Sequence, residues 1–304
     1  MYQPTSIAEA SALLRNRGPG GRFLAGGTDL VIAVKEKGLA PKYVVDLKRI
    51  PGLSGIRENE DGSITIGALT TMRALETSAL IVERFPFLAQ SAAEVGSIQI
   101  RNRATVGGNM ANATPSADVA PALIALDATV LIENGEHERT VPLEEFFRGP
   151  GQTVLSAEEI LTQITIPSPV RSEDRGRKRL VGEYIKFSPR DMMDLAYVGV
   201  AVAYLLLEPE RRCERVRIVL GAVAPTPMRA RAAEAVLEGQ GLTEGLAARA
   251  AAEAARESRP ISDVRSSAEY RRAMVEAMTK RALLNAAAPR AERIAWCERR
   301  ERRY

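Results

Sequence analysis

Apolar and polar residues alternate in a pattern that predicts short strands and helices from the start of the chain. Residues 23–25 are apolar and have the length of a short strand, and apolar residues at helical spacing follow over 29–35. A second short apolar run at 43–47 completes a β-α-β arrangement. Ser6 and Glu9 form a capping box, which predicts a helix ahead of the first strand. We place the end of this first unit at residue 54.

A second unit, residues 55–170, contains more elements. Alternating residues predict strands at 63–67 and 159–166, and alternating runs on either side of Asn134-Gly135 predict a hairpin over 128–141. Other apolar residues recur at helical spacing. The expected helices are 71–76, 87–95, 119–126 and 143–147.

The last part of the chain has strands first and helices afterwards. Residues 171–179 contain no apolar side chain, so we interpret them as a linker or exposed loop. Long apolar runs then predict a three-stranded antiparallel sheet with one buried face, and alanine-rich segments predict three helices. The strands are expected at 184–187, 197–207 and 215–223, and the helices at 228–237, 243–256 and 270–287. The pattern is typical of an α+β protein with a third unit at 171–287 and a tail at 288–304.

Two glycine pairs are candidates for phosphate binding. Ala25-Gly26-Gly27-Thr28-Asp29-Leu30 follows the first strand, and Thr105-Val106-Gly107-Gly108-Asn109 comes about eighty residues later. Glycine has no Cβ, so successive backbone N–H groups can face one anion, and the start of a helix adds positive charge. Thr28 can donate its hydroxyl to a phosphate oxygen, whereas we expect Asp29 to cap the helix. Two such turns would supply a bridging pyrophosphate with donors from two sides.

The alternative is that each glycine pair is only a tight turn. Neither motif has the G-x-G-x-x-G pattern of a Rossmann fold or the G-x-x-x-x-G-K-[ST] pattern of a Walker loop. The motifs therefore indicate neither of these two nucleotide-binding classes.

Composition limits the chemistry that the side chains can perform. The chain has two cysteines, Cys213 and Cys297, and one histidine, His137, in a charged stretch of the predicted hairpin. A metal site, a cysteine-ligated cluster and histidine acid–base catalysis are all poorly supported, so we expect no catalytic side chain and no metal ligand. A bound cofactor must then carry any redox chemistry.

Charge and hydropathy indicate where the protein is located and what it binds. No apolar run has the length of a membrane span, and the first residues lack the pattern of a signal peptide, so we expect a cytoplasmic protein. The 42 basic residues are nearly balanced by 38 acidic ones, and aromatic residues make up only 5%, which argues against nucleic-acid binding. Arginines are concentrated in the tail, which we interpret as solvated or as a contact for an acidic partner subunit.

The paired glycine motifs, their spacing and the third unit of strands followed by helices resemble the FAD-binding medium subunit of the molybdenum hydroxylases. This family includes xanthine dehydrogenase and aerobic carbon monoxide dehydrogenase, and the resemblance covers residues 1 to about 287. It implies two FAD-binding subdomains of the vanillyl-alcohol-oxidase (PCMH) type, residues 1–54 and 55–170, and a C-terminal domain of a three-stranded sheet with three helices. Neither His nor Cys lies near the glycine motifs, so we expect the FAD to be held non-covalently.

The resemblance also implies which residues contact FAD. Asp118 matches a polar contact on the sugar or adenine side, and Lys186 a cationic neighbour. For these two, a surface ion pair or a helix cap is the structural alternative. Leu161 matches an apolar wall, and Leu195 would lie against the isoalloxazine ring. The residues expected around the pyrophosphate are Leu24, Ala25, Gly26, Gly27, Thr28, Asp29, Leu30, Thr105, Gly107, Gly108 and Asn109.

The function implied by the resemblance is electron transfer within a complex. A large subunit would hold a molybdenum cofactor, and a small subunit with two [2Fe–2S] clusters would deliver electrons to the FAD of this chain. The flavin would pass them to NAD⁺, a quinone or oxygen, in an assembly expected to be a dimer of heterotrimers. Two cysteines are too few for the [4Fe–4S] loop that some members carry.

Two other hypotheses remain open at this point. One is a stand-alone flavin reductase or oxidase of the same broad fold, similar to UDP-N-acetylenolpyruvoylglucosamine reductase. It would need its own substrate pocket with an acid near the flavin. The other is a basic, non-enzymatic protein that binds nucleic acid or another acidic partner, and its binding would fall steeply with salt.

Overall fold

Three apolar cores organise the part of the chain that a computed structural model describes, residues 1–169, 177–190 and 192–288. One core belongs to the N-terminal unit, one to the middle of the chain and one to the C-terminal part. The basic tail and most of the predicted linker lie outside the described residues.

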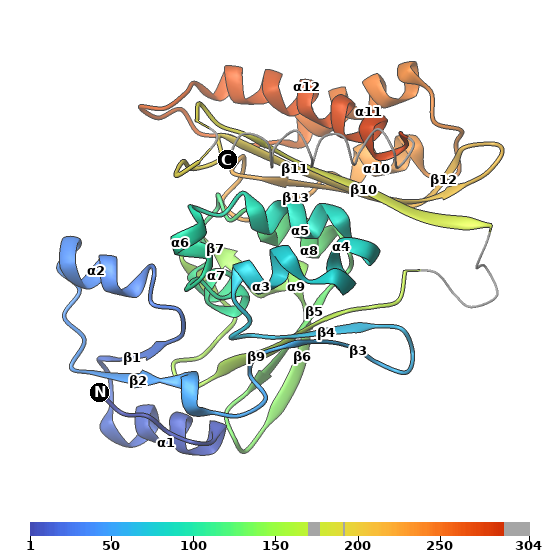
Figure 1. The fold of residues 1–304 in the computed structure, drawn as a ribbon. Coiled ribbons are helices and arrows are strands. Elements are labelled where there is room, and N and C mark those ends of the chain that lie inside the picture. The colour runs from blue at the N-terminus through green and yellow to red at the C-terminus, as the bar shows by residue number, and fades with distance from the viewer. Residues whose placement is uncertain (170–176, 191, 289–304) are drawn as a thin grey trace.

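The N-terminal unit is a β-α-β arrangement at one side of the molecule (Figure 1). Helix α1 (Ile7–Arg17) begins after Ser6, whose side chain accepts a hydrogen bond from the N–H of Glu9, as the capping box predicts. Strands β1 (Gly21–Leu24) and β2 (Tyr43–Asp46) are parallel, and α2 (Leu30–Glu36) connects them. A 3₁₀ helix η1 (Leu47–Arg49) follows β2.

The middle of the chain forms a five-stranded antiparallel sheet in the order β3-β4-β9-β5-β6. The hairpin and both predicted strands are present. The sequence pattern missed the short strand β3 and the ribbon β7-β8, because they are only two or three residues long and have no alternation to detect. The strands are β3 (Ile56–Glu58), β4 (Ile64–Gly67), β5 (Thr129–Glu133), β6 (Glu138–Pro142), β7 (Phe147–Gly149), β8 (Gln152–Thr153) and β9 (Ile160–Ile166).

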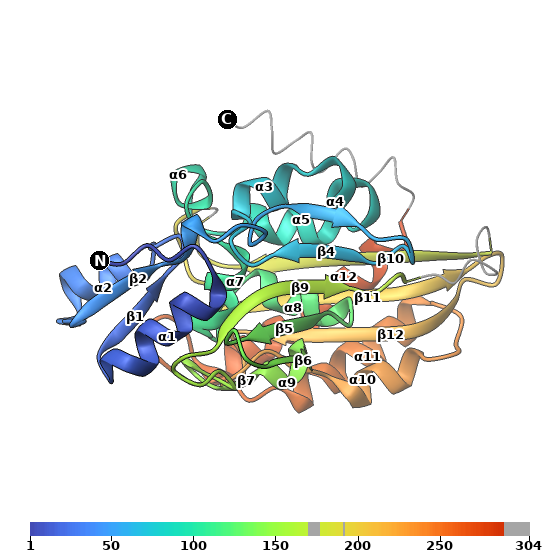
Figure 2. The same ribbon diagram turned by 90° about the horizontal axis from the view of Figure 1, so that it is seen from below.

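A layer of helices lies between this sheet and the C-terminal sheet (Figure 1), and in Figure 2 the strands of the middle sheet lie in front of those of the C-terminal sheet. Every residue of α8 is buried because the helix packs against strands of the C-terminal sheet on one side and against the middle core on the other. The helices are α3 (Met72–Thr77), α4 (Ala79–Arg84), α5 (Pro86–Ala93), α6 (Ile98–Arg101), α7 (Val106–Asn112), α8 (Val119–Ala125) and α9 (Leu143–Phe146).

The C-terminal sheet has four strands, in the order β10-β11-β12-β13. The three predicted strands are present, and the two-residue β13 (Met228–Arg229) adds a fourth, where the start of a helix was expected. The expectation of one buried face is wrong, because α10 and α12 pack on one face and α5 and α8 on the other, which buries nine of the ten residues of β11. The remaining elements are β10 (Lys178–Phe187), β11 (Val198–Leu207), β12 (Arg212–Gly221), α10 (Arg231–Leu237), α11 (Glu244–Glu257) and α12 (Ala268–Ala286).

Two general features of the described residues bear on function. None of the described helices combines the length and the hydropathy needed to cross a bilayer. Within the same residues, no three His, Cys, Asp or Glu side chains come together in a group that could hold a metal ion.

Candidate functional site

The first glycine motif connects β1 to α2 and presents a run of backbone donors. Gly27 has a φ of +82°, a left-handed conformation that glycine adopts without strain. The backbone N–H groups of residues 26–30 have no hydrogen-bond acceptor in the described part of the chain. Five consecutive donors at the start of a helix form a group that can bind an anion such as a phosphate.

Asp29 does not cap this helix, so that prediction is wrong. Its side chain makes no capping hydrogen bond, and its backbone, with φ −95° and ψ −44°, is helical rather than extended. An N-cap side chain reaches the amides of the first turn from an extended backbone, so this conformation points the carboxylate elsewhere.

The second glycine motif is the first turn of helix α7 rather than a loop. The Thr105 side chain caps the helix by accepting a hydrogen bond from the N–H of Gly108 at 3.1 Å. The N–H groups of Val106 and Gly107 donate to the carbonyl oxygens of Thr70 and Ala68, at 2.9 and 2.8 Å. These amides are therefore occupied and do not offer the free donors that the sequence pattern predicted. Asn109 contributes a buried side-chain oxygen, Oδ1, that has no partner in the described residues.

The glycines of the two motifs bring the motifs into contact. A Cβ on Gly26 would lie 2.0 Å from the carbonyl oxygen of Arg103, just before the second motif. A Cβ on Gly108 would lie 3.7 Å from the Cβ of Ala25, and one on Gly107 would lie 2.5 Å from the Cβ of Ala68. No larger residue fits at positions 26 and 107 without movement of the backbone. The first motif and the start of α7 thus form one continuous site.

Lys48 adds a positive charge beside the first motif. Its Nζ donates to the carbonyl oxygen of Ala25 at 3.1 Å and lies 2.6 Å from the carboxylate of Asp46. Sequence reasoning missed Lys48, because it lies beyond the next strand and belongs to no motif.

A second cluster of polar groups is buried between the helical layer and β10. Lys186 Nζ donates to Asp118 Oδ2 and to the carbonyl oxygen of Glu94, both at 3.0 Å. Tyr184 donates its hydroxyl to Asp118 Oδ1 at 2.9 Å. The side chains of Lys186 and Asp118 are only 5% and 8% exposed, so a surface ion pair is excluded. Asp118 also makes no capping hydrogen bond, so neither structural alternative holds.

Burial sets the electrostatics of this cluster. It raises the pKa of Asp118 to about 6, although the ammonium of Lys186 and the hydroxyl of Tyr184 both favour the carboxylate. Burial also raises the pKa of Tyr184 well above its ordinary value, so this hydroxyl keeps its proton. Sequence reasoning missed Tyr184, although its spacing of two residues from Lys186 places both side chains on one face of β10.

The two predicted leucine contacts lie in different environments. Leu161 is in β9, and its side chain is part of the middle apolar core. Leu195 is 46% exposed in the loop between β10 and β11. The N–H of Met193 donates to the carbonyl oxygen of Gly96 at 3.2 Å, so this loop lies beside the start of α6. Leu195 thus lies in an exposed loop beside α6, whereas Leu161 is buried in the middle core.

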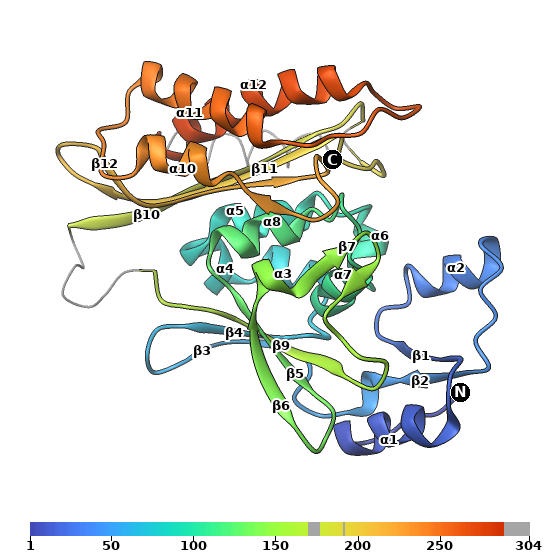
Figure 3. The ribbon, with the colours of Figure 1, turned by 180° about the vertical axis from the view of Figure 1, so that it is seen from behind.

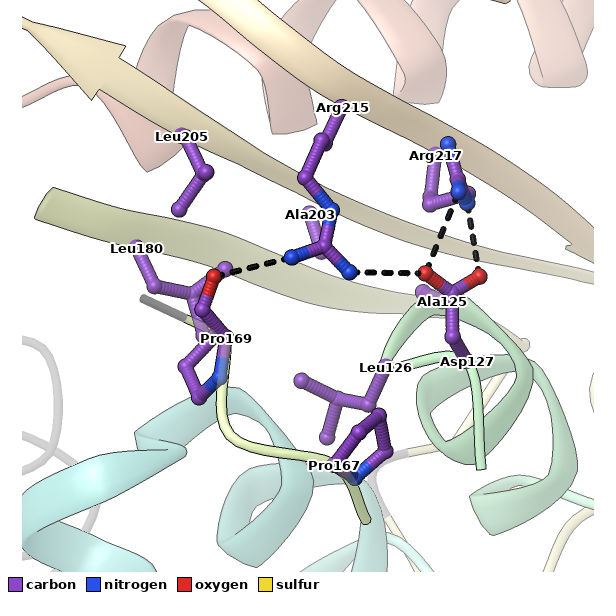
Figure 4. Close-up of a pocket in the computed structure, with 10 residues that line it drawn as sticks. All are labelled: Ala125, Leu126, Asp127, Pro167, Pro169, Leu180, Ala203, Leu205, Arg215 and Arg217. Carbon is purple, nitrogen blue, oxygen red and sulfur yellow. Dashed lines mark hydrogen bonds and ion pairs between the residues drawn. The ribbon is translucent and has the colours of Figure 1, made fainter. Parts of the chain in front are cut away.

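A small pocket beneath the C-terminal sheet lies elsewhere and includes none of the predicted site residues (Figure 4). Arg217 holds Asp127 through two hydrogen bonds of 2.7 and 3.1 Å, and Arg215 donates to the carbonyl oxygen of Pro169 at 2.9 Å. Its charged groups are paired with one another across the boundary between the middle and C-terminal cores. We interpret this pocket as part of the interdomain contact.

The geometry of the site suits an extended, anionic ligand rather than side-chain catalysis. The backbone donors of residues 26–30 favour negative charge, and Gly26 and Gly107 allow the two motifs to pack closely against their neighbours. The Lys48 ammonium is paired with the Asp46 carboxylate. Asn109 Oδ1 is a buried acceptor with no donor in the described residues, so it suits a donor group of a ligand and not a phosphate oxygen. These observations fit the pyrophosphate of a dinucleotide cofactor.

Two family models match consecutive parts of the chain. Residues 1–169 match the model described as the FAD binding domain in molybdopterin dehydrogenase. Residues 183–286 match the model described as the CO dehydrogenase flavoprotein C-terminal domain.

Individual relatives match over nearly the full length. The carbon monoxide dehydrogenase medium chain of Hydrogenophaga pseudoflava is 34% identical over 282 residues, which cover 93% of this chain and 94% of the relative. The xanthine dehydrogenase FAD-binding subunit of Escherichia coli O157:H7 is 32% identical over 287 residues, with 94% and 95% covered. A solved structure of carbon monoxide dehydrogenase from Hydrogenophaga pseudoflava, which lacks the Mo-pyranopterin moiety of the molybdenum cofactor, contains a chain that aligns with a TM-score of 0.87 and 36% identity. That alignment covers 94% of this chain and 96% of the other.

Proposed function

The chain belongs to the family of FAD-binding subunits of the molybdopterin dehydrogenases, and from this premise we propose how it holds FAD and which partners it serves. It is an oxidoreductase subunit with FAD as its cofactor. Bound flavin supplies the redox chemistry by exchanging electrons with one-electron and two-electron carriers. The residues of this chain bind and orient it.

We assign the pyrophosphate to the first glycine motif. The free N–H groups of residues 26–30 donate to its oxygens, the start of α2 adds positive charge, and the hydroxyl of Thr28 is available as a further donor. The second motif contributes close packing through Gly107, and the unpaired Oδ1 of Asn109 can accept a hydrogen bond from a donor elsewhere on the cofactor. The observation that carries this proposal is the run of five unpaired amides held against the start of α7.

We further propose that the buried pair of Asp118 and Lys186 fixes the polar side of the FAD site. The pairing keeps the Lys186 ammonium in one position, which would fix its charge at a defined place beside the cofactor. Leu161 and Leu195 are proposed as apolar neighbours of the cofactor. The absence of His and Cys from both motifs supports non-covalent binding.

The larger assembly is also a proposal. The relatives are a medium chain and an FAD-binding subunit, which supports a complex with a molybdenum-cofactor large subunit and an iron–sulfur small subunit with [2Fe–2S] clusters. Electrons would arrive from those clusters and leave to NAD⁺, a quinone or oxygen. We retain the expectation of a dimer of heterotrimers.

We also propose that residues 1–170 have the vanillyl-alcohol-oxidase type of fold and that the units end at residues 54, 170 and 287. Three apolar cores, each drawn mainly from one of these units, support this division of the chain.

An absorption spectrum of the purified chain before and after acid precipitation tests the proposal. We expect flavin absorption in the native protein, and we expect FAD to move wholly to the supernatant when the protein is precipitated. A colourless chain that binds no added FAD in a titration would refute the proposed site. Flavin that stays with the precipitate would refute non-covalent binding.

A further inference from the structure

Lys48 is held in one position beside the first glycine motif, although 40% of its side chain is exposed. A lysine side chain at a surface normally keeps much of its rotamer freedom. Here the backbone N–H of Lys48 donates to Asp46 Oδ1 at 3.1 Å, and its Nζ lies 2.6 Å from the same oxygen. The Nζ also donates to the carbonyl oxygen of Ala25 at 3.1 Å. These contacts fix the ammonium between Asp46 and the motif.

The pairing of β1 with β2 explains why Lys48 reaches the motif. The two strands lie side by side in the N-terminal unit, on the right in Figure 3, and Leu24 is paired with Asp46. Ala25 directly follows Leu24, and η1 begins directly after Asp46. The register of the two strands therefore brings Lys48 to the start of the first glycine motif.

Asp46 balances the charge of Lys48. Its side chain is only 7% exposed, and burial opposes its charged form, but the hydrogen bonds from Lys48 hold the pKa of Asp46 below its ordinary value. The carboxylate therefore stays ionised at neutral pH and remains paired with the ammonium. Because the pair as a whole adds little net charge, its contribution to the site is the fixed hydrogen bond to Ala25.

This hydrogen bond decides the direction of the next N–H group. Within the described residues the only cis peptide bond is Glu208–Pro209, so the bond between Ala25 and Gly26 is trans. In a planar trans peptide the C=O and the N–H point in opposite directions. Since Lys48 holds the oxygen on one side, the Gly26 N–H points away from Lys48, and it is the first of the five unpaired donors.

The glycines make such a constraint useful. A peptide group next to glycine can turn over at little steric cost, because glycine has no Cβ. A turned peptide would present the Ala25 carbonyl oxygen to an anion in place of the Gly26 N–H, and the two would repel each other. The donation from Lys48 stabilises the other orientation, and it polarises the peptide group so that the N–H becomes a stronger donor.

We propose that Lys48 is a positioning residue of the FAD site, which directs the Gly26 N–H to the pyrophosphate by holding the Ala25 carbonyl. This rests on the proposed function. Asp46 fixes Lys48, Lys48 fixes the peptide group, and the peptide group donates to a phosphate oxygen. Lys48 acts through this peptide and not by contact with the cofactor.

Four variants of the full-length chain test this role. Lys48→Met removes the donor at a similar side-chain length, and Lys48→Arg keeps a charged donor. Because Lys48→Met leaves the buried Asp46 carboxylate without its partner, Lys48→Met combined with Asp46→Asn is measured as well. The matched control is Lys42→Met, since Lys42 is an exposed lysine just before the other end of β2. Circular dichroism of each apo chain checks that it is folded.

The affinity for FAD is measured by fluorescence titration. We expect Lys48→Met, alone and with Asp46→Asn, to bind FAD about tenfold more weakly, as for the loss of a charge-assisted hydrogen bond. Lys48→Arg should keep most of the affinity, and Lys42→Met should bind as wild type. The salt dependence of binding should be the same in Lys48→Met and wild type, because Asp46 balances the ammonium.

The phosphorus NMR spectrum of bound FAD separates positioning from a general loss of structure. At saturating FAD, Lys48→Met should shift the signals of the pyrophosphate, because a phosphate oxygen loses a well-placed donor. The flavin absorption bands should keep their wild-type positions, since the isoalloxazine ring lies outside this contact. Lys42→Met should leave both spectra unchanged.

Four results would overturn the role of Lys48. Lys48→Met could bind FAD as tightly as wild type, or Lys48→Arg could bind it as weakly as Lys48→Met. Weaker binding with unchanged phosphorus signals would mean that Lys48 only stabilises the fold. A smaller salt dependence in Lys48→Met would mean that the ammonium contacts a phosphate directly. Wild-type chain that binds no FAD would instead refute the proposed function, and this inference with it.

Discussion

Lys186 on β10 and Asp118 at the start of α8 are 68 positions apart in the sequence, and their side chains form a buried ion pair with 3.0 Å between Nζ and Oδ2. The pair connects the C-terminal sheet to the helical layer. Removing one partner leaves the other as an uncompensated buried charge. We expect Lys186→Met to lower the free energy of unfolding by about 3–5 kcal/mol.

A double variant tests whether this loss comes from the unpaired charge. Lys186→Met combined with Asp118→Asn removes both charges, while Tyr184 keeps an acceptor in the asparagine oxygen. Urea unfolding of the apo chain should show a smaller loss for the double variant than for Lys186→Met alone. A double variant that loses the sum of the two single effects would contradict the pairing.

The raised pKa of Asp118 predicts a pH dependence of stability. Because the folded-state pKa is about 6 and the ordinary value is 3.8, the folded chain holds this proton over a pH range in which the unfolded chain has released it. The contribution of Asp118 to stability therefore falls as pH rises from about 4 to 6. The difference in unfolding free energy between wild type and Asp118→Asn should shrink over this range.

Glu159 provides a control, because its pKa is shifted in the opposite direction to that of Asp118. Its hydrogen bond to Arg139 lowers its pKa to about 2 from 4.5, so its contribution is present above pH 4.5 and is lost as pH falls toward 2. The difference between wild type and Glu159→Gln should be flat from pH 5 to 6. A wild-type to Asp118→Asn difference that is also flat there would show that Asp118 titrates normally.

Gly26→Ala should disrupt the contact between the two glycine motifs. The added Cβ would lie 2.0 Å from the carbonyl oxygen of Arg103, so the backbone has to move. We expect a loss of stability of about 1–3 kcal/mol, as for other overpacked sites, and at least tenfold weaker binding of FAD in a fluorescence titration. Gly245→Ala is the control, because its Cβ meets no atom within 4 Å in helix α11. Equal FAD affinity in both variants would argue against a shared site.

The contact between Asp127 and Arg217 in the pocket of Figure 4 should contribute measurably to stability. Asp127 has a φ of +53°, which asparagine also tolerates, so Asp127→Asn removes the charge without new backbone strain. We expect a loss of about 1–3 kcal/mol, since charged hydrogen bonds are involved. Glu253→Gln, whose partner Arg256 is largely exposed, should change stability by no more than about 0.5 kcal/mol in the same urea titration. Equal losses of stability in Asp127→Asn and Glu253→Gln would mean that the contact of Asp127 with Arg217 contributes no more than an exposed ion pair.

Local patterns predicted most elements, and they failed where distant contacts decide the structure. The second glycine motif was expected to be a turn with free backbone donors. It is helical because Thr105 caps it and because Val106 and Gly107 donate to Thr70 and Ala68.

The sequence pattern missed the beginning of β10 for another reason. Lys178 and Arg179 looked like part of a linker, but β10 is an edge strand, and charged residues are tolerated there. The site itself was predictable only in part. The first glycine motif lies within one stretch of sequence, whereas the contact of Gly26 with Arg103 and the pairing of Lys186 with Asp118 join residues that no local pattern connects.

The apolar core of the N-terminal unit has a consequence for how the chain is made. Besides residues from α1 and β2, this core contains Ile160, from the last strand of the middle sheet, and Leu69. When the first 54 residues leave the ribosome during synthesis, this core lacks both side chains. The unit that carries the first glycine motif thus has to wait until about a hundred more residues have been translated, and it becomes fully stable only together with the sheet that follows it.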